Sequence, residues 1–427
     1  MHIAQESNQV ANFGSKLWPW IVCFSASLFF FYECIQGNMF ASIADNIMQD
    51  FHIQADKMAY LSSIYYLSNV VFLLVAGVVL DRYSAKNTIL VAMLLCILST
   101  FILAYAHSFY LALLCRFITG IGSAFCFLGP VRIASRWFPP RRMAMITGVI
   151  VTIAMTGGML AQYPLAKLVG QIGWRDSLLQ VGWLGLGMLI IMYFGIVDKK
   201  NSNPPVAVKN GKELLRIARQ TYLNSQNMRA ALYASLMNMA IAVFGAMMGS
   251  LYLMQRLDIT KEDAAVINSM LFLGAILGGP FIGWLSDKRG LRILPMKIAA
   301  LLSLLTLCLI LYFPLTAQMM KVLFFLLGFF TAAQIISYAV VAESSPSNMT
   351  ATAISSVSVL VQGGYILYQN LYSYLLIHHG EVKFLNNIPV YSLGDYQFAA
   401  CMLPIGLIIA LLGLFGLKET YGKNLED

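Results

Sequence analysis

Long runs of apolar residues, separated by short polar stretches, make up most of the chain. A helix needs about 20 mostly apolar residues to cross the hydrocarbon core of a bilayer. Twelve runs reach this length, so the pattern predicts twelve membrane-spanning helices and two termini on the same side of the membrane. The expected spans lie near residues 18–46, 58–80, 88–106, 109–131, 143–168, 174–197, 229–254, 264–285, 293–315, 320–342, 350–378 and 397–417.

The composition supports a chain that folds in lipid. Of the 427 residues, 59% are hydrophobic and only 11% are charged, whereas a soluble domain carries roughly 25% charged residues. The seven cysteines show neither a disulfide framework nor the spacing of metal ligands. We therefore expect an all-α membrane protein with no metal and no cofactor. It is not expected to be an enzyme, because no nucleophile–base pair is visible within the spans.

The net charge of +9 could indicate a nucleic-acid partner, but the distribution of the charges favours another explanation. With the N-terminus inside the cell, 20 of the 28 Lys and Arg residues fall in cytoplasmic segments, seven in outer loops and one, Arg116, inside a span. This asymmetry follows the positive-inside rule. It predicts cytoplasmic termini, a multi-pass protein of the inner (cytoplasmic) membrane, and membrane lipids rather than nucleic acid as partners of the basic residues.

One polar segment divides the chain. Residues 198–228 are polar and basic, and they contain two consecutive prolines. Six expected spans precede this segment and six follow it. The sequence therefore predicts an N-terminal six-helix bundle over residues 1–197, a cytoplasmic linker over 198–228 and a C-terminal six-helix bundle over 229–427.

A short motif follows the second span of each half. GVVLDRYSAK begins at Gly77 and GWLSDKRGLR begins at Gly283, and four chemically matching positions share an offset of 206 residues. A constant offset indicates a duplicated six-helix unit, which is a common architecture of transporters. The predicted cytoplasmic gate residues are Gly77, Asp81, Arg82 and Lys86 in the first copy and Gly283, Asp287, Lys288 and Arg292 in the second.

The expected role of this motif is to hold the two halves together on the cytoplasmic side. Each glycine lets two helices approach closely, and each aspartate can meet the positive N-terminal end of a helix in the other half. We expect Asp81 to lie near residues 345–348 and Asp287 to lie next to Arg141 and Arg142.

The two copies resemble motif A of the major facilitator superfamily, G-x-x-x-D-[RK]-x-G-x-[RK]. The second copy matches fully, and the first departs from the pattern at Ser84 and Ala85. RFITGIGSA, which contains Arg116, Gly120 and Gly122, resembles motif B of the same family. The resemblance covers the whole chain and implies two six-helix bundles around a central cavity that opens alternately to each side.

A narrower similarity points to a subgroup of that family. YECIQGNMF and ASRWFPPRRMAMITG are similar to segments of the phagosomal nutrient transporters of intracellular bacteria. The resemblance implies uptake of amino acids or nucleosides.

Two ionisable side chains, Glu33 and Arg116, lie clearly within expected spans. Counted from the span ends, both lie roughly 8–10 Å from the outer face of the hydrocarbon core, so they can be partners. One interpretation is a fixed ion pair that joins the first and fourth spans. The other is a proton site, in which protonation of Glu33 frees Arg116 for a substrate carboxylate or lets the bundles rearrange. In the resembled family, the motif B arginine is associated with proton coupling.

The other polar groups deep in the spans are neutral. Each can be a helix–helix hydrogen bond by itself, but as a set they predict an uncharged polar surface for a solute. A phosphate ester would need several basic groups, and only Arg116 is present, so a zwitterion or a polar neutral molecule is favoured. The predicted substrate-binding residues are Gln36, Asn38, Tyr65, Asn69, Gln162, Asn238, Asn268, Gln334, Tyr338, Gln362, Tyr365 and Gln369.

The sequence therefore predicts a monomeric secondary transporter that imports a small polar nutrient, such as an amino acid, by alternating access. The proton gradient is the expected energy source. Nucleosides and small peptides are alternative substrates, and export of a small metabolite or drug is the alternative direction. Outside transport, the alternative is a membrane receptor or scaffold, which would need neither the duplicated motif nor the buried acid and base.

Overall fold

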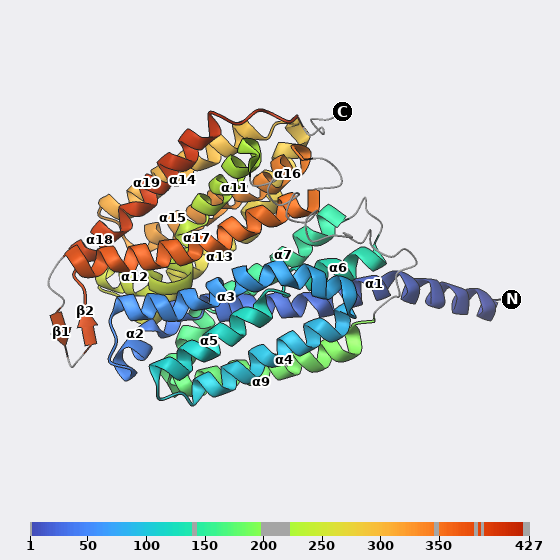
Figure 1. Cartoon of the computed structure of the whole chain (residues 1–427), viewed down its shortest axis with the longest axis horizontal. Helices are drawn as coiled ribbons and strands as arrows, with labels where there is room; N and C mark the ends of the chain where they lie inside the picture. Colours follow the sequence, from blue (N-terminus) through green and yellow to red (C-terminus); the bar gives the residue numbers. More distant parts are fainter. Residues whose placement is uncertain are drawn as a thin grey trace.

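The computed structural model describes residues 2–138, 143–197, 223–345, 350–379, 383–385 and 388–421. Helices account for nearly all of the described chain (Figure 1). Ten helical segments of the described residues are long and apolar enough to cross a membrane. The helices α3 (Ala55–Arg82) and α17 (Thr350–His379) add 28 and 30 residues, which is more than the roughly 20 that one crossing needs. The count of twelve spans stays a prediction.

The helices before and after residues 198–222 form two groups that pack mainly within themselves. We call them the N-terminal bundle (α1–α9) and the C-terminal bundle (α11–α19). The predicted linker lies largely outside the described residues, and α11 begins at Ser225, four residues before the predicted span.

The N-terminal bundle contains α1 (His2–Asn38), α2 (Phe40–Asp50), α3, α4 (Ala85–Ala104), α5 (Phe109–Ser123), α6 (Leu128–Trp137), α7 (Met143–Leu160), α8 (Tyr163–Ile172) and α9 (Trp174–Gly195). The C-terminal bundle contains α11 (Ser225–Met237), the π-helix η2 (Ile241–Met248), α12 (Gly249–Leu257), α13 (Lys261–Arg289), α14 (Ile293–Tyr312), α15 (Ala317–Thr331), the 3-10 helix η3 (Ala332–Gln334), α16 (Ile335–Glu343), α17, α18 (Leu393–Ala400) and α19 (Met402–Leu414). A small antiparallel hairpin, β1 (Lys383–Leu385) and β2 (Ile388–Val390), was not expected from the sequence.

The two ends of the molecule differ. We call the end at which α1 and α13 approach the chain termini the terminal end, and the opposite end, with α2, α12 and the hairpin, the distal end (Figure 1). The bundles contact each other through α3 and α17, through α7 and α13, and through α2 and η2. A Cβ atom at Gly158 of α7 would touch Phe272 of α13, whereas a Cβ atom at Gly148 or Gly283, toward the terminal end, would meet nothing within 4 Å. Among the described residues, no close helix approach occurs at Gly283 in this conformation, and the role of Gly283 in the gate stays a prediction.

Several predicted spans are divided into shorter helices, and two of these interruptions bear on the site. Pro164 has no backbone N–H and cannot continue a helical hydrogen-bond ladder, so α7 ends at Leu160 and α8 begins at Tyr163 with the proline in its first turn. Ser42 of α2 donates its hydroxyl to the carbonyl oxygens of Ala161 (2.7 Å) and Gln162 (3.1 Å) at this break. In the C-terminal bundle, α11 and α12 are joined by the π-helix η2. The sequence pattern predicted neither interruption.

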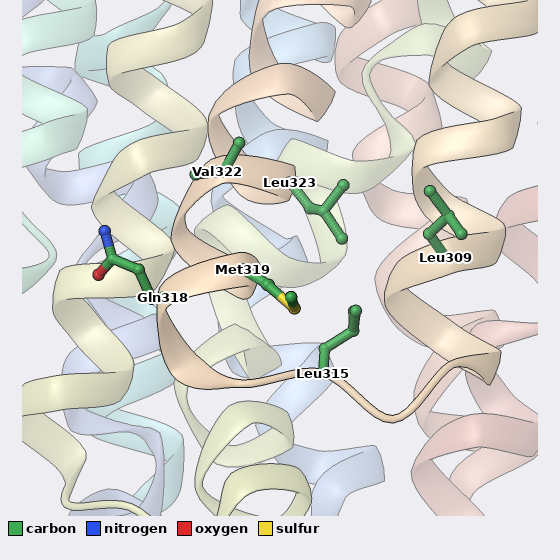
Figure 2. A pocket seen from close by; sticks show the side chains of 6 residues that line it. All are labelled: Leu309, Leu315, Gln318, Met319, Val322 and Leu323. Carbon is green, nitrogen blue, oxygen red and sulfur yellow. The ribbon is translucent and has the colours of Figure 1, made fainter.

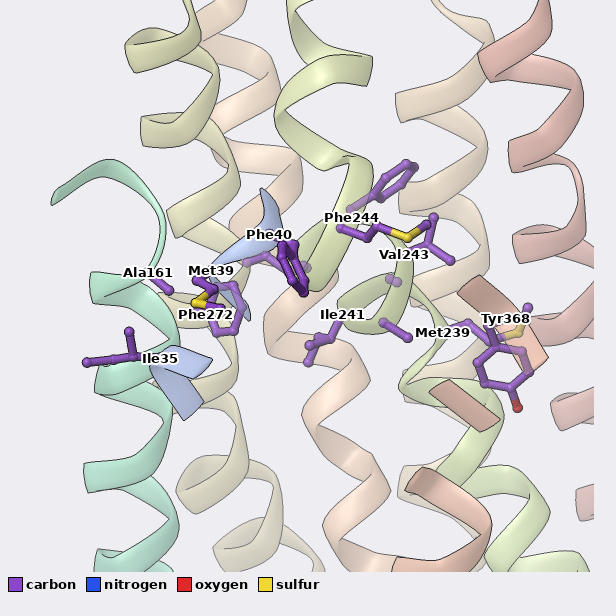
Figure 3. Close-up of a cluster of buried hydrophobic side chains, with 14 of the residues drawn as sticks. Ile35, Met39, Phe40, Ala161, Met239, Ile241, Val243, Phe244, Phe272 and Tyr368 are labelled. Atoms are coloured by element: carbon purple, nitrogen blue, oxygen red, sulfur yellow. The ribbon is translucent and has the colours of Figure 1, made fainter. Parts of the chain in front are cut away.

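The apolar core is continuous across the bundle interface. Figure 3 shows Ile241, Val243 and Phe244 of η2 in one cluster with Phe40 of α2, Phe272 of α13 and Ala161 at the break between α7 and α8. The interface between the bundles is therefore packed with apolar side chains at this level.

Candidate functional site

Glu33 of α1 is almost fully buried, with 1% of its surface exposed. The hydroxyl of Tyr65 on α3 donates to Glu33 Oε2 at 3.0 Å. Glu33 Oε1 has no hydrogen-bond partner among the described residues. A buried carboxylate with one satisfied oxygen is costly to keep charged, so this group is suited to gain or lose a proton.

Arg116 of α5 is fully buried and lies between two aromatic rings. Its guanidinium carbon is 4.7 Å from the ring centre of Phe40 and 4.6 Å from that of Tyr65, a cation–π arrangement that partly replaces water. Arg116 Nη1 donates to the carbonyl oxygen of Gln36 at 3.1 Å, while Nε and Nη2 find no partner in the part of the chain that the structure describes. The Arg116 guanidinium is thus stabilised by two aromatic ring faces and one carbonyl oxygen rather than by a carboxylate.

The expected direct ion pair between Glu33 and Arg116 is not formed in this conformation. The salt bridges within 4.0 Å that the structure shows among its described residues do not include this pair. Tyr65 connects the two charges instead, because its hydroxyl binds Glu33 and its ring covers Arg116. The similar depth that the sequence indicated is consistent with this shared neighbour, but only packing decides that a tyrosine lies between them.

Three other predicted polar residues of the N-terminal bundle bind within that bundle. Gln36 donates to Thr100 Oγ1 (2.8 Å), Asn38 to the Cys34 carbonyl (2.8 Å) and Asn69 to Ser123 Oγ (2.7 Å). All three predicted side chains are buried. In this conformation their donors stabilise helix contacts, and their role as solute ligands stays a prediction.

In the C-terminal bundle two amides pair with each other. Asn238 and Gln334 exchange hydrogen bonds in both directions, with 3.1 Å for the bond from Gln334 Nε2 to Asn238 Oδ1. Three predicted side chains of spans ten and eleven are half-buried: Tyr338, Gln362 and Tyr365. The Tyr365 ring lies 4.6 Å from that of Tyr66 on α3, so an aromatic contact joins the two bundles beside Tyr65.

Three further predicted substrate ligands lie around η2. Gln162 donates to the Gly245 carbonyl at 2.9 Å and accepts from Asn268 at 2.7 Å, and Gln369 donates to the Ala242 carbonyl at 3.1 Å. The amide groups of all three residues are fully buried. Their donors are bound to protein groups in this conformation.

An ion pair at the distal end was missed by sequence reasoning. Lys261 Nζ lies 2.5 Å from Asp45 Oδ1 and also donates to Asn46 Oδ1 at 2.7 Å. Asp45 lies near the outer end of the first expected span and was not among the candidate site residues. No local pattern could reveal the pair, because Asp45 and Lys261 are 216 residues apart in the chain.

The second copy of the gate motif forms a charge cluster inside its own bundle. Arg292 binds Asp287 at 2.5 Å and Glu343 at 2.7 Å. Burial lowers the pKa of Arg292, but hydrogen bonds to Glu343 and Asp287 outweigh burial and raise the pKa. Asp287 therefore has a described partner in its own loop, whereas the expected partners Arg141 and Arg142 lie outside the described residues.

The remaining gate residues are described only in part. The ammonium groups of Lys86 and Lys288 lie over the rings of Tyr193 (5.1 Å) and Trp284 (4.9 Å). The side chains of Asp81 and Arg82, and the surroundings of Gly77, lie outside the described part of the chain. The predicted contact of Asp81 with residues 345–348 is therefore untested.

A shallow hollow of about 330 Å³ lies between α14 and α15, away from Glu33 (Figure 2). Its walls are almost entirely apolar, and Gln318 is the polar exception among its lining residues: Leu309, Leu315, Gln318, Met319, Val322 and Leu323. It offers little for binding a polar solute.

Two helical bundles in a membrane, with a buried acid and base beside their interface, define the class of multi-pass membrane transporters. The family model described as Major Facilitator Superfamily matches residues 23–368 and 230–426, and the chain belongs to this family. The family and its transporter members indicate transport rather than enzymatic catalysis.

Curated relatives are distant and carry different substrates in their names. A hexuronate transporter of Bacillus subtilis is 24% identical over 253 residues, which cover 56% of this chain and 58% of the relative. A 4-hydroxybenzoate transporter of Pseudomonas aeruginosa is 22% identical over 319 residues, covering 67% and 70%. The match thus spans less than two thirds of the length of the hexuronate transporter.

Solved structures agree in fold over nearly the whole chain. A bacterial homolog of the human lysosomal transporter Spinster, in an inward-facing and occupied conformation, has a TM-score of 0.75 at 16% identity and covers 93% of this chain and 96% of its own. A point mutant of the nucleoside transporter NupG has a TM-score of 0.73 at 15% identity, with 92% and 99% covered. At these identities the likeness concerns the fold alone.

Proposed function

We propose that this protein is a proton-coupled importer of a small polar solute that carries a carboxylate, such as an amino acid. The observation that carries the proposal is the buried Glu33–Tyr65–Arg116 cluster, in which both charged groups keep unpartnered polar atoms. Removing one partner of buried charges is costly, so a proton on Glu33 and an anion near Arg116 would each change the stability of this arrangement. That mutual dependence is what coupling requires.

The substrate class follows from the chemistry that surrounds the cluster. Arg116 is the single basic group deep in the predicted spans, and the half-buried groups of the C-terminal bundle are amides and phenols. Hexuronate and 4-hydroxybenzoate, the solutes in the names of two relatives, each carry one carboxylate. A nucleoside, as in the name of NupG, is the alternative that a neutral site would accept.

The orientation of the chain decides which end of the molecule faces the cytoplasm. The asymmetry of Lys and Arg favours cytoplasmic termini in the inner membrane, so the terminal end would face the cytoplasm. Contacts between Lys261 and Asp45 and between Gln162 and Asn268 join the bundles toward the distal end. The conformation would then be inward-facing, as in the Spinster homolog, and monomers would suffice for alternating access.

Uptake by purified protein in liposomes tests this function. A pH gradient, acidic outside, is imposed, and amino acids, dipeptides, nucleosides and organic acids are offered as radiolabelled solutes. We expect gradient-driven uptake of one carboxylate-bearing class, and Glu33→Gln should abolish the dependence on the gradient. The control is Glu262→Gln, the same chemical change at an exposed glutamate.

The outcomes separate the alternatives. Gradient-driven uptake that Glu33→Gln leaves unchanged would contradict the proton site. Uptake of nucleosides alone would show that the substrate is a nucleoside and not a carboxylate-bearing solute. Solute movement only out of the liposomes would indicate export in place of import. Solute binding without any movement would favour a membrane receptor.

A further inference from the structure

The π-helix η2 is held by side-chain amides from three other segments. Gln162 donates to the Gly245 carbonyl (2.9 Å), Asn268 of α13 to the Phe244 carbonyl (2.9 Å) and Gln369 of α17 to the Ala242 carbonyl (3.1 Å). π-helices are rare and frequently mark functional sites. We call these three residues the amide collar of η2.

One member of the amide collar comes from the other bundle. Asn268 and Gln369 belong to the C-terminal bundle like η2, but Gln162 lies at the break between α7 and α8. Its backbone is fixed there by Pro164 and by the hydroxyl of Ser42, which binds the Gln162 carbonyl. The side chain therefore links the position of the N-terminal bundle directly to η2.

The side chain of Gln162 can connect two groups of the C-terminal bundle at once. Its amide donates to the Gly245 carbonyl and at the same time accepts from Asn268 Nδ2 at 2.7 Å. A carboxamide supplies a donor and an acceptor together, whereas a carboxylate only accepts. When the bundles separate, both contacts must be lost, and leaving buried polar groups without partners is unfavourable.

We propose that Gln162 is the positioning residue of the distal gate, which holds η2 in its π-helical form while that end is closed. On opening, Gln162 withdraws and η2 rewinds into an α-helix. A π-helical turn holds one residue more than an α-helical turn. When η2 rewinds, this residue joins the α-helical register, which turns the following segment by about 100° and shifts it by about 1.5 Å, so α12 would rotate relative to α11. The inference rests on alternating access in the proposed function, but neither on its protons nor on its solute.

Hydrogen exchange measured by mass spectrometry tests this role, without solute and without a pH gradient. For Gln162→Ala we expect amide exchange to rise at least about tenfold in η2, in α12 and across the interface in α2, because the bond to the Gly245 carbonyl and the bond from Asn268 are both lost. The matched control is Gln369→Ala, which removes a collar bond inside one bundle. It should raise exchange near Ala242 and leave α2 unchanged.

A second variant separates gating from simple loss of stability. Gln162→Glu keeps an acceptor for Asn268, but it can donate to the Gly245 carbonyl only when protonated. After exchange rates are divided by the intrinsic rate at each pH, we expect low protection in α2 and η2 at pH 8 and wild-type protection at pH 5. Gln162→Ala should show the same low protection at both pH values.

Two results would overturn the inference. One is equal exchange in α2 for Gln162→Ala and Gln369→Ala. The other is a structure of Gln162→Ala, open at the distal end, in which η2 remains a π-helix. Failure of proton-coupled uptake would leave both tests intact, because the exchange experiment requires no transport.

Discussion

Tyr65 is the residue on which the buried charges depend. Its hydroxyl is the hydrogen-bond donor to the Glu33 side chain, and its ring covers Arg116. The adjacent Tyr66 has a different partner, since its hydroxyl donates to the neutral carbonyl of Gly37 at 2.9 Å. The two neighbouring tyrosines therefore offer a direct comparison between a charged and a neutral acceptor.

Tyr65→Phe should destabilise the protein more than Tyr66→Phe. A hydrogen bond to a charged group contributes about 1.5–3 kcal/mol, and one to a neutral group about 0.5–1.5 kcal/mol. Denaturant unfolding of both variants in detergent micelles measures the difference. Equal losses would contradict an ionised Glu33 in this conformation.

At the scale of elements, motif B is a packing device as well as the carrier of Arg116. A Cβ atom at Gly120 of α5 would overlap the carbonyl oxygen of Tyr65 and the hydroxyl of Ser68 on α3. The glycine thus allows α3 and α5 to approach closely. This approach places Tyr65 against Arg116, which lies one helical turn before Gly120.

Gly120→Ala should therefore disturb both folding and the site. Overpacking costs about 1–3 kcal/mol, and a clash with backbone atoms cannot be relieved by a side-chain rotation. Gly148→Ala is the control, because a Cβ atom there meets nothing within 4 Å; alanine should stabilise that helix by about 0.5–1 kcal/mol. Thermal unfolding followed by size-exclusion chromatography compares the two, and a wild-type midpoint for Gly120→Ala would refute the close approach.

For the whole molecule, the distal end is closed by contacts that join the bundles. The Lys261–Asp45 ion pair is half-buried, Asn370 donates to Ser63 at 2.9 Å, and the backbone N–H of Ala55 donates to the Tyr391 hydroxyl at 3.1 Å. Each contact is modest, so their sum can be broken during a transport cycle.

Reversing the charge of either Asp45 or Lys261 should impair transport, and reversing both charges together should restore it. Asp45→Lys faces Lys261 with a like charge, and Lys261→Asp faces Asp45 in the same way. An ion pair near the surface is worth up to about 1 kcal/mol, so its loss alone should shift the closed state by up to roughly fivefold. The repulsion between like charges in each single variant adds to this shift. Initial uptake rates in liposomes measure the effect. The double variant should recover most of the rate, and additive losses would argue against a shared role in closure.

The sequence by itself determined the membrane environment and the family, and it singled out the buried charges. Apolar runs of about 20 residues and the placement of Lys and Arg are local features that act wherever the chain lies in a bilayer. Glu33 and Arg116 could be selected for the same reason, because a charge within an apolar run is visible without any partner. The helical membrane fold is confirmed, and so is the membership in the major facilitator superfamily.

Only the tertiary structure decided which groups meet. Three contacts join residues from different segments. They are the hydrogen bond from Tyr65 to Glu33, the ion pair between Lys261 and Asp45, and the hydrogen bond from Gln162 to Gly245 of η2. Such contacts depend on how helices pack against one another, and that packing depends on small residues such as Gly120 and on breaks such as the one before Pro164. The buried amides of Gln162, Asn268 and Gln369 look alike in the sequence, but the packing of the helices gives each of them a different carbonyl partner.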